Sequence, residues 1–107
     1  MTDKVVVLVT CGSAKEARRI ARAVVEQKLA ACVNVLDARV ESVYRWKGKV
    51  ESAKEFLLLI KTSRRRLPAL QKKIQQLHSY DVPEVVALPI VAGSRRYLAW
   101  VNDSVGP

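Results

Sequence analysis

The stretch Val50-Glu-Ser-Ala-Lys-Glu-Phe-Leu-Leu-Leu-Ile-Lys-Thr62 decides the fold that we expect for this chain. Its centre, Phe56 to Ile60, is apolar at every position, so a strand built from it must bury both of its faces. Helices of the same chain can cover one face. The other face of a small one-layered sheet stays in water unless a further copy of the chain covers it. The sequence therefore predicts a sheet protein that forms an oligomer.

A second long strand precedes this stretch and is expected to pair with it. Residues 31–46 are rich in β-branched side chains, but their alternation slips near Ala38, which indicates a bulge or bend. Trp46-Lys-Gly-Lys49 is typical of a hairpin turn, with Gly48 at the position that needs a positive φ. Both strands exceed the usual length of about 5–6 residues. We expect the hairpin to project beyond the sheet and to pair its free edges across subunits.

The remaining segments complete an alternating order of strands and helices. Apolar residues at three- and four-residue spacing predict two helices, one capped by Ser13 and one by Ser63. The order strand-helix-strand-strand-helix-strand, followed by a helix, predicts an α+β sandwich with two helices on one face of an antiparallel sheet. The predicted elements are strands over 4–10, 31–46, 50–62 and 84–91, helices from 14 and after 63, and a C-terminal helix from 94.

Length and composition indicate a single small domain spanning residues 1–107. No apolar tract reaches the 18 residues of a membrane span, and we expect no membrane partner. The run from Val5 to Val9 matches a buried strand better than a signal peptide. Cys11 and Cys32 lie far apart and form no Cys-x-x-Cys pair. Two free thiols are typical of a cytoplasmic protein.

The net charge of +9 permits nucleic acid, an anionic surface or an acidic ligand as partner. The alternative is a surface that is basic only for solubility, and we favour this interpretation. RNA-recognition domains share the strand order but stack bases on aromatic residues of the third strand. The segment from Glu55 to Ile60 has a single aromatic residue and no glycine. We therefore expect non-specific nucleic-acid binding at most.

The loop His78-Ser-Tyr-Asp-Val-Pro-Glu84 contains the only histidine and lies between a predicted helix and a predicted strand. Polar side chains held between two rigid elements often bind ligands. The alternative is structural, because a histidine here can cap the carbonyls of the preceding helix. Cys11 precedes a helix N-terminus, a position that lowers a thiol pKa. The alternative for Cys11, and the interpretation favoured for Cys32, is a small buried apolar residue.

The sequence offers no pattern of an enzyme. It contains no Ser/His/Asp or Cys/His arrangement with a plausible third member, and no phosphate-binding G-x-x-x-x-G-K-[ST] loop. Asp81 and Glu84 enter the last predicted strand and are expected to point apart, which argues against acid–base cooperation. We therefore predict no catalytic residues.

Tyr44 and Trp46 alternate to one face near the hairpin tip. Packing between subunits is the interpretation that we favour. The alternative is a cleft between subunits that is lined by these rings, in which Lys61, Tyr80 and Glu84 supply polar groups for a small ligand. The identity of such a ligand, or of a protein partner, does not follow from the sequence.

Five motifs in order extend these observations to a family. They are Leu29-Ala-Ala-Cys-Val-Asn34, Ser42-Val-Tyr-Arg-Trp-Lys-Gly48, Lys61-Thr62, His78-Ser-Tyr-Asp-Val-Pro-Glu84 and Tyr97-Leu-Ala-Trp100. Together they resemble the CutA divalent-cation-tolerance family from about residue 5 to residue 101. The resemblance implies a ferredoxin-like subunit, a homotrimer built by strand pairing, and a cytoplasmic bacterial protein linked to copper and other divalent metals. The trimer also resembles the PII signalling proteins, which implies the alternative of a small-molecule sensor or adaptor with an indirect link to metals.

The resemblance places metal contacts at Cys11 and His78. Thiolate and imidazole suit copper or zinc, and we expect copper. Two protein ligands predict a weak, labile site rather than a closed one with four. We expect the first and last strands not to adjoin, so Cys11 and His78 need not meet within one subunit and could meet across a trimer interface. The sequence departs from the family pattern at Gly12 and Ser79, where the family usually has proline.

Overall fold

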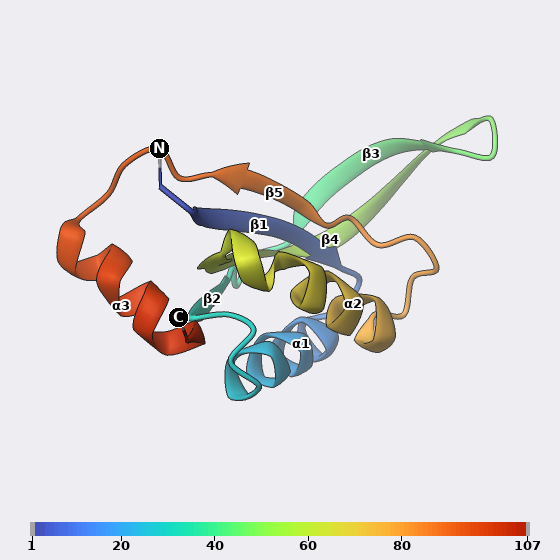
Figure 1. Cartoon of the computed structure of the whole chain (residues 1–107). Coiled ribbons are helices and arrows are strands. Elements are labelled where there is room, and N and C mark those ends of the chain that lie inside the picture. Colours follow the sequence, from blue (N-terminus) through green and yellow to red (C-terminus); the bar gives the residue numbers. More distant parts are fainter. Residues whose placement is uncertain (1, 107) are drawn as a thin grey trace.

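A computed structural model describes residues 2–106 and contains an antiparallel sheet with helices on one face (Figure 1). The strands follow the order β2-β4-β1-β5, and β3 pairs with the far end of β4. The predicted α+β order is confirmed. The elements are β1 (Lys4–Cys11), α1 (Ala14–Glu26), β2 (Cys32–Val35), β3 (Val40–Trp46), β4 (Lys49–Ser63), the 3-10 helix η1 (Arg64–Arg66), α2 (Leu67–Leu77), β5 (Val86–Pro89) and α3 (Arg95–Val105).

Helices α1 and α2 cover the same face of the sheet, and the core lies between them and the strands (Figure 1). The predicted cap of α1 is confirmed, because the Ser13 hydroxyl accepts a hydrogen bond from the Glu16 N–H at 3.1 Å. The predicted cap of α2 is wrong. Ser63 makes no side-chain cap bond, because η1 separates it from the start of α2. The largest fully buried core side chains are Ile20, Leu58, Ile60, Leu70, Ile74, Val7, Val9 and Val24.

The long hairpin projects beyond the sheet, as predicted, and its tip is a two-residue turn (Figure 1). Lys47 and Gly48 have φ values of 50° and 80°, so the glycine occupies the expected left-handed position. The predicted single strand over 31–46 divides into β2 and β3. Residues 36–39 separate the two strands, which is the bend that the slipped alternation indicates.

Strand β5 is shorter than the predicted 84–91 and pairs with β1, from Val5 opposite Pro89 to Leu8 opposite Val86. The expectation that the first and last strands do not adjoin is therefore wrong. Each strand-helix-strand crossover skips one position in the sheet. The crossover through α2 starts at β4 and passes β1, which places β5 beside β1.

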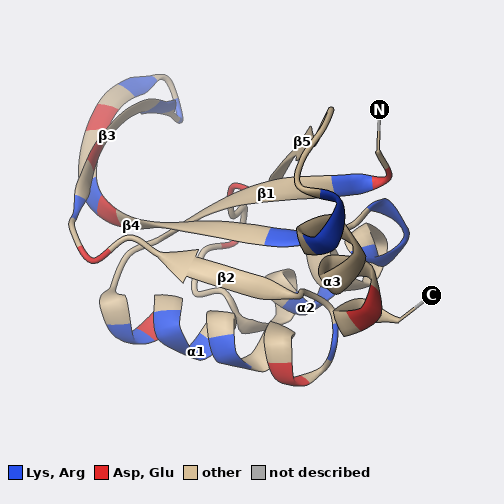
Figure 2. Ribbon diagram, turned by 90° about the vertical axis from the view of Figure 1, so that its left-hand side faces the viewer, with Lys and Arg blue, Asp and Glu red and all other residues tan. Residues whose placement is uncertain are grey.

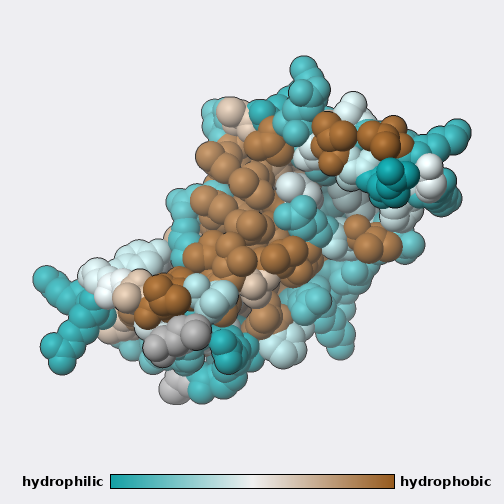
Figure 3. All heavy atoms as spheres, turned by 90° about the horizontal axis from the view of Figure 1, so that it is seen from above, coloured by the Kyte–Doolittle hydropathy of each residue, from teal (hydrophilic) through white to brown (hydrophobic). Residues whose placement is uncertain are grey.

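We call the sheet face opposite α1 and α2 the open face, and among the described residues 2–106 no helix crosses its centre (Figure 1). Figure 3 shows a band of apolar side chains on this side, and Figure 2 places most Lys and Arg of α1 on the opposite side. Val86 and Leu88 are 46% and 47% exposed, and Leu57 and Leu59 remain half-buried. No helix within residues 2–106 has the length and apolar character needed to cross a membrane.

Cys32 does not lie in the core, contrary to the favoured interpretation. It pairs in register with Lys61 on the open face and is half-buried. Its sulfur lies 3.6 Å from the Tyr97 hydroxyl of α3. Both cysteines are free thiols, as predicted.

Candidate functional site

Cys11, Glu16 and His78 meet within one chain. One ligand atom from each residue lies within 4.8 Å of the other two. Cys11 ends β1, Glu16 lies in the first turn of α1, and His78 directly follows α2, so three elements bring the residues together. No subunit interface is needed to bring Cys11 and His78 together, because the pairing of β1 and β5 brings the loop that connects α2 to β5 over the end of β1.

Glu16 is a residue of this site that sequence reasoning missed. Its Oε2 accepts a hydrogen bond from the Ser79 N–H at 2.9 Å. Its Oε1 is buried, has no hydrogen-bond partner, and lies 3.9 Å from His78 Nδ1. The spacing Ser13-x-x-Glu16 is that of a capping box, which places a carboxylate at the start of a helix. That spacing is the signal that could have identified Glu16.

His78 is 7% exposed, and both of its ring nitrogens have partners. Nε2 lies 2.7 Å from the Thr10 carbonyl oxygen, and Nδ1 accepts a hydrogen bond from the Tyr80 N–H at 3.0 Å. A tautomer that donates from Nε2 and accepts at Nδ1 satisfies both contacts. The side chain therefore binds the backbone of β1 rather than capping the carbonyls of α2. A metal ion at Nδ1 must replace the Tyr80 N–H.

Cys11 is a neutral thiol rather than the predicted thiolate. Burial, and after it the negative charges of the Glu16 and Glu55 carboxylates, raise the pKa of Cys11 to about 12. The helix N-terminus that was expected to lower this pKa carries Glu16 in its first turn, and this negative charge opposes the effect of the helix dipole. A metal ion binding at Cys11 must displace the thiol proton.

The two departures from the family pattern both touch this site. A Cβ added at Gly12 would lie 3.2 Å from the Tyr80 hydroxyl oxygen, so the glycine leaves room for this ring. Ser79 supplies the N–H that binds Glu16, and a proline at this position has no N–H to donate. The chain therefore fixes its Glu16 carboxylate by a contact that a proline here cannot make.

The donor set suits a divalent metal ion. Thiol sulfur and imidazole nitrogen are ligands of copper and zinc, and a carboxylate oxygen completes three positions. The buried Glu16 Oε1 without a partner is a group that a bound cation would satisfy. Within residues 2–106, this is the only cluster that brings three such ligand atoms together.

A pocket of about 710 Å³ lies beside this cluster, between the β3–β4 hairpin and the loop after His78. Four of the predicted cleft residues line it: Tyr44, Trp46, Tyr80 and Glu84. Asp81 lines it together with Glu84. The pocket forms within one chain. Its lining is Thr10, Ser42, Val43, Tyr44, Trp46, Glu55, Tyr80, Asp81, Val82, Pro83 and Glu84.

Lys61 does not line this pocket of the single chain. It lies on the open face, where its ammonium group donates to the side-chain oxygen of Asn34. Strand β4 is long enough to separate Lys61 from Glu55, the residue of the same strand that lines the pocket.

Tyr80 contacts both the metal-ligand cluster and the pocket. Its ring packs on His78 with a centroid distance of 4.7 Å, and its hydroxyl donates a hydrogen bond to Glu55 at 2.8 Å. Its backbone N–H binds His78 Nδ1. The two sites therefore share one residue.

Residues 5–104 match the family model described as CutA1 divalent ion tolerance protein. The "Divalent-cation tolerance protein CutA" of Thermus thermophilus is 48% identical over 101 residues, covering 94% of this chain and 97% of that protein. "Protein CutA, chloroplastic" of Arabidopsis thaliana is 47% identical over 100 residues. The aligned residues cover 94% of this chain but 54% of the plant protein, so the chain spans about half the length of that relative.

A solved structure agrees with the same assignment. The "Divalent cation tolerance protein (Cut A1)" of Thermus thermophilus superposes with a TM-score of 0.94 at 48% identity. The superposition covers 96% of this chain and 99% of the other. The five-stranded antiparallel sheet and three helices described above therefore have the architecture of a solved relative.

Proposed function

The chain belongs to the CutA1 divalent ion tolerance family, and on this premise we propose that it binds a divalent metal ion, copper first, at Cys11, Glu16 and His78. The observation that supports this most is the buried Glu16 Oε1, which has no hydrogen-bond partner and faces a thiol and an imidazole. An unpaired buried carboxylate oxygen is costly, and a bound cation removes that cost.

The contacts of the three residues also explain why binding should be weak and labile. An incoming ion must displace the Cys11 proton, which burial and two carboxylates hold firmly, and the Tyr80 N–H from His78 Nδ1. Three protein ligands leave a fourth position for water or an exchanging ligand. The site then suits the transient binding of copper or zinc rather than a permanent structural ion.

Calorimetric titration of copper(II) into the reduced protein tests this proposal, with redox-inert zinc as comparison. We expect saturable binding that is lost in Cys11→Ser and His78→Gln and weakened in Glu16→Gln. Glu26→Gln is the matched control, because Glu26 lies exposed at the end of the same helix. Heat that is unchanged by all three site variants would contradict the proposal, and so would an equal loss in the control.

We also propose a homotrimer as the assembled form. Support comes from the apolar open face and from the free edges of β2, β3 and β5, which a further copy of the chain can pair and cover. Light scattering should give about 36 kDa, three times the 12.0 kDa chain. A mass of about 12 kDa at working concentrations would refute it.

A second candidate function is favoured by the pocket. In this alternative, the trimer senses a small molecule or acts as an adaptor in the manner of PII-like proteins, and its link to metals is indirect. The pocket lies next to the metal-ligand cluster, which gives such a link a physical route through Tyr80. We propose a non-enzymatic role in either case, with residues 1–107 forming one domain, and a cytoplasmic location, which the two free thiols favour.

A further inference from the structure

We propose that the pocket between the β3–β4 hairpin and residues 80–84 binds a small organic cation, an ammonium group carried on an apolar body. This inference rests on the second candidate function and names the class of its ligand. Its lining residues differ from the metal ligands, since none of Cys11, Glu16 and His78 lines the pocket.

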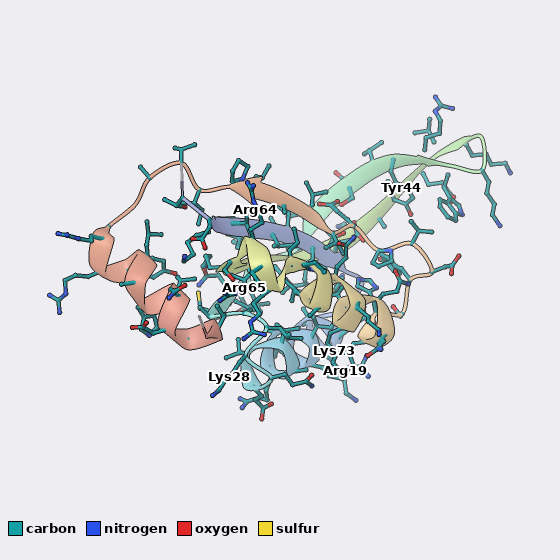
Figure 4. All side chains as sticks on the ribbon, viewed as in Figure 1. Arg19, Lys28, Tyr44, Arg64, Arg65 and Lys73 are labelled. Atoms are coloured by element: carbon teal, nitrogen blue, oxygen red, sulfur yellow. The ribbon has the colours of Figure 1, made fainter. Side chains whose placement is uncertain are left out.

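The charge of the pocket is opposite to that of the chain. The protein carries a net charge of +9, yet Glu55, Asp81 and Glu84 line the pocket, and no lysine or arginine does. Figure 4 shows Tyr44 on the hairpin and the labelled basic side chains, such as Arg19 and Lys73, beside the helices. Carboxylates grouped in a cleft attract a positively charged ligand.

The aromatic lining indicates an organic cation. Tyr44, Trp46 and Tyr80 come from two different segments and border the same space. The faces of such rings attract ammonium groups, and cages of this kind recognise quaternary ammonium ligands. Val43, Val82 and Pro83 add apolar surface for the body of the ligand.

Glu55 provides the anchoring charge. It is 6% exposed, and one carboxylate oxygen accepts the hydrogen bond from the Tyr80 hydroxyl. In the part of the chain that the structure describes, no basic side chain lies within ion-pair distance of it. A buried carboxylate without a counter-charge is unfavourable, and a cation in the pocket supplies that charge.

A bare metal ion fits this pocket poorly. Over residues 2–106, the carboxylates of Glu55, Asp81 and Glu84 do not bring three ligand atoms close enough together to hold one. The volume of about 710 Å³ also exceeds what a single ion needs and lies in the range of pockets for small organic ligands.

A charge series of matched probes tests the inference. Choline, its neutral carbon isostere dimethylbutanol and the anionic dimethylbutyrate have similar shapes and differ in charge. Each is titrated into the full-length protein in its assembled form, because Glu55 lies on the same side of β4 as Leu57 and the pocket therefore adjoins the open face. Trp46 and Trp100 are the only tryptophans, so their indole NMR signals report inside and outside the pocket.

We expect choline to shift the Trp46 signal saturably and to bind at least about tenfold more tightly than dimethylbutanol. Glu84→Gln and Tyr44→Leu should each weaken choline by several-fold. Glu41→Gln should leave it unchanged, because Glu41 is an exposed carboxylate of the same hairpin that does not line the pocket.

The other outcomes separate this inference from the function on which it rests. If dimethylbutanol or dimethylbutyrate binds as tightly as choline, the cation inference is overturned and the small-molecule pocket stands. If none of the three probes moves the Trp46 signal, both are overturned. An effect of Glu41→Gln equal to that of Glu84→Gln would mean that general surface charge attracts choline, which also overturns the inference.

Discussion

Alkaline pH is expected to destabilise this protein through a single buried thiol. Cys11 has a pKa of about 12 in the folded chain, raised by burial and by Glu16 and Glu55 from an ordinary value of 9.0. Below pH 9, the thiol is protonated in both the folded and unfolded states and has no pH-dependent effect. Above pH 9, the unfolded state loses this proton while the folded state keeps it, so the free energy of unfolding falls as pH rises.

The size of this loss of stability follows from the interval between the pKa values of Cys11 in the unfolded and folded states. One group contributes about 1.4 kcal/mol for each pH unit between its two pKa values, so roughly 4 kcal/mol is lost by pH 12. Other groups also titrate in this range, including Tyr80, whose pKa is raised to about 12 chiefly by burial. The contribution of Cys11 is therefore measured as a difference in pH slope between wild type and Cys11→Ala.

The assay is chemical denaturation at a series of pH values from 7 to 11 at fixed subunit concentration. Val9→Ala is the control, because Val9 is a fully buried residue of the same strand without a titratable group. Its cavity should lower stability by a similar amount at every pH. If Cys11→Ala has the same alkaline slope as wild type and Val9→Ala, the thiol does not have the perturbed pKa on which this reasoning depends.

Three further predictions test the site and the assembly. Ser79→Pro removes the N–H that binds Glu16, and the loss of a hydrogen bond to a charged group should weaken copper binding about tenfold or more. Ser79→Ala keeps this N–H and should bind copper like wild type in calorimetry. Leu59→Glu places a charge on the open face and should shift the mass in light scattering toward 12 kDa. Arg18→Glu, on the exposed side of α1, should leave the mass unchanged. If Leu59→Glu also leaves the mass unchanged, the open face is not the interface. Saturating zinc should weaken choline binding by several-fold through Tyr80, and an unchanged choline affinity would show that the two sites are independent.

The features predicted correctly from sequence depend on neighbours along the chain. The turn at Gly48 and the cap at Ser13 each follow from local backbone geometry. The bend between β2 and β3 follows from a break in side-chain alternation, because a strand keeps its apolar side chains on one face only while they recur at every second residue. The cap predicted at Ser63 was wrong for a local reason as well. A 3-10 turn lies between Ser63 and α2, and apolar periodicity does not detect such a turn.

The site was harder to predict because it depends on contacts between distant segments. Cys11 and Glu16 lie more than 60 residues before His78, and the crossover through α2 brings them together. The pKa of Cys11 was predicted in the wrong direction, because the sequence shows the nearby helix N-terminus but not the burial of the thiol. Lys61 and Glu55 belong to one strand, and only the pairing of β3 with β4 shows that Glu55 rather than Lys61 lines the pocket together with Tyr44 and Trp46.

Tyr80 explains why the metal and pocket functions need not be alternatives. Its N–H binds the same His78 nitrogen that a metal ion would use, and its hydroxyl holds the carboxylate that we assign to the organic cation. An ion at Nδ1 must displace that N–H, and the ring packed on His78 must then move with its backbone. Gly12 places no Cβ against the Tyr80 hydroxyl, so no side chain at this position opposes such a movement. Because thermodynamic coupling is reciprocal, a cation that fixes Tyr80 on Glu55 must weaken metal binding by the same factor. The response of the protein to a metal ion and its response to a small organic cation can therefore both report the same equilibrium between two positions of Tyr80.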